Sequence, residues 1–429
     1  MNLSAIFSAI KSEKLLRGSS ILFVTTMVAN LCNYLFQFLM SRELSTGDYG
    51  AMNSLFSLMM VLSVPTISIL MVVSKHISKF TAHHEDGKAK GIFIVLLKRV
   101  SQVAALLFIA IALLSPSISS YLKMITITPV IIVGLIISLS FILYVPLGAL
   151  QGRQSFFYLG IGLALLGVMR LLFGVVFSSL SITLNGALGA VLGSLVVVLL
   201  VSVISLRKFF TLKREPAGGE TRRAFFYSFP VVVSLTSFMV LIYSDMFLVK
   251  HYFPADIAGR FAALAVVGKI IVYLPAAIVL ALFPLVSEST ALHQKRQSYQ
   301  MLTRALSYNL LLAGLCLIIF VLFPKLTLTL LFGAKFAPLY PLLRLYGVAM
   351  FLYSILNVLM NFNLACNYTN FVYSFIISAV LQIYLISTFH ESLQYVVSIL
   401  IGNAGLLLAF NLLMTFWKRK KLAYEKQSI

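Results

Sequence analysis

Four ionisable side chains lie inside long apolar runs of the sequence, where charge is costly. Arg170 and Lys269 each lie about midway along a run, whereas Asp245 and Arg344 lie nearer the ends of theirs. Charged residues at such positions mark a ligand site, an ion path or an internal pair. Three cations and one anion predict a cavity that holds a negative ligand. Internal Asp–Lys or Asp–Arg pairing, or snorkelling to an interface, is the alternative reading.

Amide side chains add a second pattern at the start of the chain. Thr26, Asn30, Asn33 and Gln37 follow one another at spacings of four, three and four, which places them on one face of a helix. A polar face in an apolar segment either lines a cavity or bonds a neighbouring helix. Asp245, the only acidic residue within a run, is the candidate for coupling to a cation.

The elements that carry these residues are apolar runs long enough to cross a bilayer. The 429 residues are 60% hydrophobic and 10% charged, whereas a soluble chain is about half apolar and about a quarter charged. The composition therefore predicts an all-α polytopic membrane protein with about twelve transmembrane helices. The predicted spans are 18–40, 51–74, 98–115, 125–149, 155–178, 184–206, 225–249, 261–283, 305–323, 338–361, 366–389 and 393–416.

The basic residues agree with this count. With the N-terminus in the cytoplasm, 24 of the 33 lysines and arginines fall in cytoplasmic segments, 6 outside and 3 within spans, where Lys98 and Arg99 at the very start of the third span are counted as cytoplasmic. The positive-inside rule predicts such a bias, and an error of one span in the middle would invert it downstream. Both termini are therefore predicted to be cytoplasmic. The net charge of +21 is read as contact with anionic membrane lipids, and no nucleic-acid partner is predicted.

The two halves of the chain resemble each other. Without a gap, Tyr34 aligns with Tyr243 and Gly50 with Gly259, and a one-residue insertion then aligns Pro65 with Pro275. Two six-helix lobes with parallel pseudo-symmetry follow from this repeat. The predicted organisation is an N-terminal lobe at 1–206, a cytoplasmic linker at 207–223 and a C-terminal lobe at 224–429. Arg42 and Arg260 then lie at the outer mouths of the lobes, where they either steer an anion or snorkel.

Several short segments, in order along the chain, resemble one known family. They are the turns Leu44–Gly50 (LSTGDYG), Leu150–Arg153 (LQGR) and Ala258–Phe261 (AGRF), together with Tyr243–Asp245 (YSD). In these segments and in its twelve-span layout the chain is similar to the polysaccharide flippases of the multidrug/oligosaccharidyl-lipid/polysaccharide (MOP) exporter superfamily. The resemblance implies a MATE-like fold and a bacterial inner membrane location.

The resemblance also implies a function, which is translocation of a lipid-linked oligosaccharide repeat unit by alternating access. A lipid pyrophosphate-linked sugar suits cationic side chains for its phosphates and polar ones for its hydroxyls. Polysaccharide assembly enzymes are candidate partners. Two alternatives stay open, a cation-coupled multidrug exporter and a membrane-embedded polysaccharide polymerase or glycosyltransferase. The exporter reading calls for carboxylates at depth, and the enzyme reading calls for paired carboxylates in a large outer loop.

Other motifs are missing from the sequence. It contains no GxxxxGK[ST] loop, so no ATP site is predicted, and no catalytic residue, cofactor or metal site is predicted either. The chain is not expected to be an enzyme. The sugar, the lipid carrier, the coupling ion and the oligomeric state do not follow from the sequence.

Overall fold

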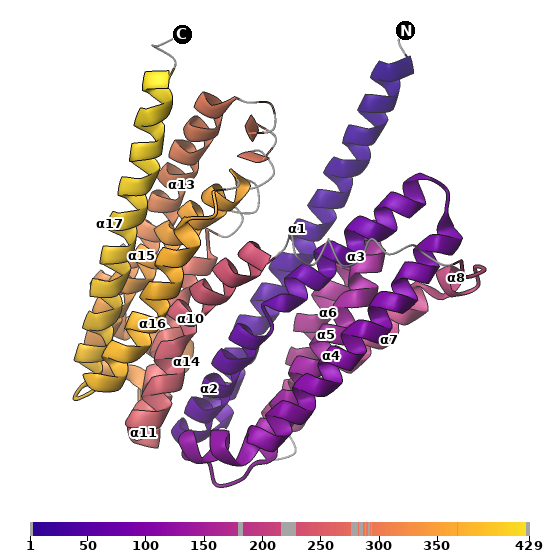
Figure 1. Cartoon of the computed structure of the whole chain (residues 1–429). Coiled ribbons are helices and arrows are strands. Elements are labelled where there is room, and N and C mark those ends of the chain that lie inside the picture. The colour runs from indigo at the N-terminus through magenta and orange to yellow at the C-terminus, as the bar shows by residue number, and fades with distance from the viewer. Residues whose placement is uncertain are drawn as a thin grey trace. The chain divides into compact units, whose positions relative to one another are not determined.

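The computed structural model describes residues 3–178, 183–215, 229–275, 282, 286–287, 289–290, 292, 294–366 and 368–425. Within these residues the chain consists of helices, turns and short connections, with no strand (Figure 1). It divides into two compact units, which we call the N-terminal unit (Met1–Ser228) and the C-terminal unit (Phe229–Ile429).

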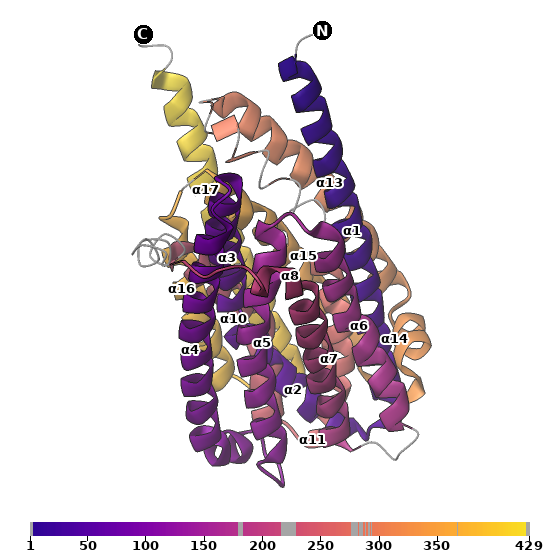
Figure 2. The same ribbon diagram turned by 90° about the vertical axis from the view of Figure 1, so that its right-hand side faces the viewer.

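The N-terminal unit contains α1 to α8. Their bounds are α1 Leu3–Glu43, α2 Thr46–Leu62, α3 Pro65–Ala82, α4 Asp86–Tyr121, α5 Thr128–Gly152, α6 Phe156–Ser178, α7 Leu184–Ser205 and α8 Arg207–Phe210. Figure 2 shows α4, α5, α7 and α6 side by side, and α5 packs directly against α3, α4 and α7. Because α5 has neighbours on several sides, it forms the centre of this unit and is among its most buried spans.

The C-terminal unit contains the remaining elements. Their bounds are α10 Phe229–Tyr252, α11 Ala255–Tyr273, α13 Lys295–Leu322, α14 Pro324–Phe332, the 3-10 helix η1 Ala334–Leu339, α15 Tyr340–Ala365, α16 Phe371–Thr388 and α17 Leu393–Glu425. The central helix here is α15, which packs against α11, α13 and α17. Two fully buried tyrosines of this helix, Tyr346 and Tyr353, are therefore inside the unit.

Eleven helical segments in the described part of the chain are long and apolar enough to cross a membrane, six in the N-terminal unit and five in the C-terminal unit. They correspond to eleven of the twelve predicted spans. The predicted eighth span, 261–283, coincides with α11 up to Tyr273 and then continues into residues of which several lie outside the described part. The prediction of an all-α polytopic fold is confirmed.

Proline interrupts the predicted second span. α2 ends at Leu62, and α3 begins at Pro65, which occupies the first turn of the new helix. Proline suits this position because its missing N–H would have no partner in the first turn. Pro275, its counterpart in the sequence repeat, also follows a helix end, since α11 stops at Tyr273.

Three glycines of α6, spaced seven residues apart, bring this helix close to α1. A Cβ on Gly160 would lie 3.0 Å from Ile21, one on Gly167 would lie 2.5 Å from the Ala29 carbonyl oxygen, and one on Gly174 would lie 2.9 Å from Phe36. Small residues allow such close backbone approach between membrane helices. The two helices therefore pack along most of their shared length.

The short helix α8 and the segment after it are held against the start of α4. The Lys90 ammonium donates hydrogen bonds to the carbonyl oxygens of Phe210 and Leu212, at 2.5 and 2.7 Å. The Phe93 ring contacts the rings of Phe209 and Phe210. The Arg153 guanidinium lies over the Phe209 ring and pairs with Asp86 at 3.0 Å. Residues 207–215 are thus bound to the N-terminal unit by charge and by aromatic packing.

Replacing Lys90 with methionine is expected to release this segment. The substitution keeps the aliphatic stem but removes two hydrogen bonds from a charged donor, each of which is typically stronger than a neutral one. Trypsin cleavage after Lys208 and Lys213, followed by mass spectrometry, should become roughly tenfold faster because local opening exposes these sites. Lys98→Met is the matched control, since Lys98 is exposed on the same helix about two turns further on. Equal cleavage rates in both variants would contradict the prediction.

Candidate functional site

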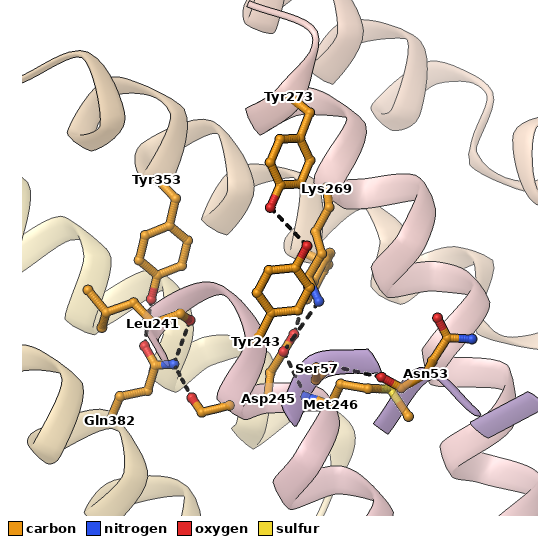
Figure 3. A network of polar contacts seen from close by, with 12 residues as sticks. Asn53, Ser57, Leu241, Tyr243, Asp245, Met246, Lys269, Tyr273, Tyr353 and Gln382 are labelled. Atoms are coloured by element: carbon orange, nitrogen blue, oxygen red, sulfur yellow. Dashed lines mark hydrogen bonds and ion pairs between the residues drawn. The ribbon is translucent and has the colours of Figure 1, made fainter. Parts of the chain in front are cut away.

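A buried carboxylate lies on α10 in the C-terminal unit. Asp245 has no exposed surface. One oxygen of the carboxylate accepts a hydrogen bond from the Tyr346 hydroxyl at 2.6 Å, and the other accepts one from the Met246 backbone N–H at 2.7 Å. The Lys269 ammonium of α11 is 3.6 Å from the second oxygen (Figure 3). The structure therefore brings two of the predicted site residues together as an ion pair.

The ammonium of Lys269 has a second partner. It lies 4.3 Å from the centre of the Tyr243 ring, a distance suited to a cation–π contact. The Tyr243 hydroxyl in turn lies 2.8 Å from the Tyr273 hydroxyl, so α10 and α11 are joined at a further point (Figure 3). Only 8% of the Lys269 side chain is exposed, so the ion pair is largely removed from water. Removing one partner of such a pair destabilises the folded protein, because the other charge is left buried and uncompensated.

Gly268 makes room for the tyrosine that holds the carboxylate. A Cβ at this position would lie 2.3 and 2.5 Å from two carbon atoms of the Tyr346 ring. No side chain can occupy that space while the ring stays where it is. The glycine next to Lys269 therefore allows α15 to approach α11 closely enough for Tyr346 to reach Asp245.

A neutral polar network lies beside the ion pair and joins four helices. The Gln382 amide of α16 donates to the Leu241 carbonyl and the Ser244 hydroxyl of α10, at 2.8 and 2.9 Å. Its oxygen accepts from Tyr353 of α15 at 2.6 Å and from Asn403 of α17 at 3.2 Å. Figure 3 shows Tyr353 and Gln382 meeting at this point. Sequence reasoning missed this network, although an amide midway along each of two apolar spans was a visible signal.

Tyr346→Phe and Tyr353→Phe test how much each acceptor depends on its tyrosine. Both rings are fully buried on α15, but Tyr346 donates to a carboxylate and Tyr353 to a neutral amide. Loss of the bond to the charged group should cost about 2–3 kcal/mol and loss of the neutral one about 1 kcal/mol. The unfolding temperature of purified Tyr346→Phe should therefore be well below that of Tyr353→Phe. The reverse order would contradict the prediction.

In the N-terminal unit, Arg170 is positioned by the close packing of α6 on α1. One terminal nitrogen of its guanidinium donates to the Asn33 side-chain oxygen at 3.0 Å. The buried Nε atom has no hydrogen-bond partner. Among the residues that the structure describes, no carboxylate forms an ion pair with Arg170. The guanidinium is therefore a cation in an apolar span whose charge is met by an amide and not by an anion.

The residues of the predicted polar face of α1 differ in what they contact. Asn33 bonds Arg170, and Gln37 accepts a hydrogen bond from the Tyr49 hydroxyl of α2 at 3.1 Å. Both residues thus bond neighbouring helices, one of the two roles expected for this face. Asn30 differs from them, since its side chain is exposed on the surface of α1.

Three further predicted cations lie apart from these contacts. Arg42, in the last turn of α1, and Arg344, in the second turn of α15, are exposed. Arg260 forms a 2.9 Å pair with Asp256, four residues earlier on α11. None of the three joins the Asp245–Lys269 pair or the Arg170–Asn33 contact in the described structure. Among the described residues, the C-terminal unit therefore contains a buried ion pair, Asp245–Lys269, and the N-terminal unit contains a half-buried guanidinium, that of Arg170, with no paired carboxylate.

Comparison with solved structures defines the class of protein. The chain is similar to a multidrug resistance MATE family transporter of the MOP superfamily in an inward-facing conformation, with 14% identity over 94% of this chain and 96% of that one, at a TM-score of 0.77. The lipid II flippase MurJ in an inward closed conformation is also similar, with 14% identity over 94% and 87% of the two chains, at a TM-score of 0.67. The protein is thus a multi-pass membrane protein with a MATE-like transporter fold.

The family follows from the sequence itself. A family model described as polysaccharide biosynthesis protein matches residues 15–290, about two thirds of the chain. The chain therefore belongs to the polysaccharide biosynthesis protein family, which confirms the expected family. No curated protein sequence matches it closely enough to add to this assignment.

Proposed function

We propose that this protein translocates a lipid-linked oligosaccharide or polysaccharide repeat unit across the membrane by alternating access. The observation that carries the proposal is the guanidinium of Arg170, a cation with no paired carboxylate among the described residues, in a chain of the polysaccharide biosynthesis protein family. A buried charge without an anion is destabilising unless a ligand uses it. A phosphate of the lipid-linked substrate would supply that anion.

The chemistry of the substrate suits these side chains. Guanidinium binds phosphate through two parallel hydrogen bonds. One terminal nitrogen of Arg170 bonds Asn33, which leaves other N–H groups of the guanidinium as donors for a phosphate. Asn30, Asn33 and Gln37 are candidates for contact with the sugar hydroxyls or with the phosphate. Arg42, Arg260 and Arg344 are candidates for attracting the anion at the ends of the spans. Lys269 is engaged with Asp245 and is not one of these candidates.

A multidrug exporter is the second candidate, because the fold is similar to that of a multidrug resistance MATE family transporter. An exporter of cationic drugs needs carboxylates at depth. The one acidic residue found inside a span, Asp245, is already engaged by Lys269 and Tyr346. We therefore favour the anionic, lipid-linked substrate. A membrane-embedded polymerase or glycosyltransferase is the third and least supported candidate.

The cellular setting belongs to the same proposal. The bias of lysine and arginine toward alternate loops favours cytoplasmic termini, and the family favours the bacterial inner membrane. Membrane lipids surround the protein, and polysaccharide assembly enzymes are its candidate partners.

The test is translocation of a fluorescent undecaprenyl-pyrophosphate oligosaccharide in liposomes that contain the purified full-length protein. Wild-type protein should move the label to the opposite leaflet, where a membrane-impermeant quencher or a lectin reports it. Protein-free liposomes and liposomes with an unrelated polytopic protein set the background. Inactivity on several such substrates, together with efflux of a lipophilic cation from the same vesicles, would overturn the proposal in favour of the exporter.

A further inference from the structure

The contacts of Asp245 divide into hydrogen bonds and a looser charge contact. Tyr346 and the Met246 N–H bond the two carboxylate oxygens at 2.6 and 2.7 Å. Lys269 is 3.6 Å away, longer than the roughly 2.7–2.9 Å of a charge-assisted hydrogen bond. The carboxylate therefore keeps its closest hydrogen bonds without Lys269. What the lysine supplies is a positive charge next to the carboxylate.

Two groups surround the Lys269 ammonium, and both attract a cation through its charge. It lies between a carboxylate and the face of the Tyr243 ring, 4.3 Å from the ring centre. Both groups attract a cation through its charge, and neither requires an N–H donor. Lys269 and Asp245 come from different helices, so the geometry is set by the packing of α10 on α11 and not by local chain structure.

We infer that Asp245 and Tyr243 form a monovalent cation site that is filled by the chain's own Lys269 ammonium. The site takes an alkali cation of the Na⁺ class only when the lysine is removed. In the wild-type protein Asp245 consequently neither binds nor couples to a free cation. This reverses the expectation that Asp245 is the coupling carboxylate, because its cation is tethered to α11 and cannot be exchanged with the solution.

This inference deepens the proposed function, since it states that the proposed translocation is not driven by Na⁺ through Asp245. It also explains why a carboxylate can persist in a membrane span of a chain proposed to bind an anion. The Asp245–Lys269 pair is neutral overall, so the C-terminal unit carries no net negative charge at this point of the span.

Thermal unfolding in two salts tests the inference without any transport. The unfolding temperature of the full-length protein in detergent is compared in about 0.2 M NaCl and in choline chloride of equal ionic strength. This comparison separates Na⁺ binding from screening by salt. Wild type is expected to unfold at the same temperature in both salts. Lys269→Ala should be less stable in choline and recover by about 3 °C or more in Na⁺, because a ligand that binds only the folded state raises its stability.

The double variant Asp245→Asn/Lys269→Ala is the matched control. It lacks both charges, so its unfolding temperature should be the same in the two salts. A Na⁺-specific rise in wild type that the double variant lacks would overturn the inference, since it would show a free cation at Asp245 despite the lysine. Equal responses of Lys269→Ala and the double variant would also overturn it. If Lys269→Ala does not fold, Lys269→Gln, which leaves a shorter neutral side chain, takes its place.

The outcome is distinguishable from a failure of the proposed function. Unfolding temperatures do not depend on the cargo, so a cation result stands whether or not the oligosaccharide moves in liposomes. Conversely, translocation that is unchanged when Na⁺ is replaced by choline on both sides of the membrane is expected of a wild-type flippase with a tethered cation. A strict requirement for Na⁺ that Asp245→Asn/Lys269→Ala abolishes would contradict the inference even in an active protein.

Discussion

Replacing Arg170 with glutamine is expected to reduce translocation of the lipid-linked oligosaccharide about a hundredfold without destabilising the protein. Loss of a charged hydrogen-bonding group that contacts a phosphate costs about 3 kcal/mol, which corresponds to about a hundredfold. Glutamine keeps a polar head that can still bond Asn33, the present partner of Arg170. Removing a half-buried charge of a membrane span that has no paired anion should leave the unfolding temperature unchanged or raise it.

The opposing effects on transport and stability separate a ligand-binding role from a structural one. If Arg170 served only to hold α1 against α6, its loss would lower the unfolding temperature and would spare the activity of the folded fraction. Arg304→Gln is the matched control, because Arg304 is exposed on α13 and is not among the candidate contacts of the substrate. Transport assays with equal amounts of inserted protein, together with unfolding curves, measure both quantities. Full activity of Arg170→Gln would remove the main support for an anionic substrate.

Among substitutions that add a single methyl group in the C-terminal unit, Gly268→Ala is expected to be the most destabilising. The new Cβ would lie 2.3 Å from the Tyr346 ring, closer than any ordinary contact. The ring is fully buried, so it can move only by displacing its neighbours and by losing its bond to Asp245. Overpacking of about 1–3 kcal/mol and a lost charged hydrogen bond of about 2 kcal/mol add to roughly 4 kcal/mol.

Gly402→Ala provides the control for this substitution. Gly402 lies on α17 in the same unit, and a Cβ there would meet no atom within 4 Å. Alanine favours helix over glycine by about 1 kcal/mol, so this variant should be neutral or slightly more stable. Unfolding midpoints of the two variants in detergent give the comparison. Equal midpoints would show that Tyr346 is not held as tightly as its contacts indicate.

Hydropathy and charge were sufficient to predict eleven membrane-spanning segments in the described part of this protein. Each crossing needs about twenty apolar residues, which a sequence displays directly. The same patterns located Arg170, Lys269 and Asp245 within spans, because a charged residue stands out in an apolar run. Pairing between Lys269 and Asp245 was one of two open readings. It depends on how α10 and α11 are rotated about their axes, and a sequence does not state that rotation.

Other features were visible in the sequence but were not interpreted. Gln382 and Asn403 lie in apolar spans and carry no charge, so a prediction based on ionisable residues did not include them. Gly268 resembles any other glycine until the position of Tyr346 is known. Arg344 lies within a predicted span, yet it is exposed near the start of α15. In each case the missing information is the identity of the facing helix, which distant parts of the chain determine.

The three glycines of α6 and Arg170 lie on the same side of the helix, the side that packs against α1. Gly160, Gly167 and Gly174 face α1 at intervals of seven residues, and Arg170 reaches Asn33 from the same register. One residue inserted between Gly160 and Gly167 would turn everything before it by about 100° relative to everything after it. Either the first glycine or the guanidinium would then leave the contact with α1. Insertions or deletions in this stretch of α6 are therefore tolerated only when they comprise about seven residues or a multiple of seven. The spacing of the glycines and Arg170 is thus more constrained than the composition of the helix.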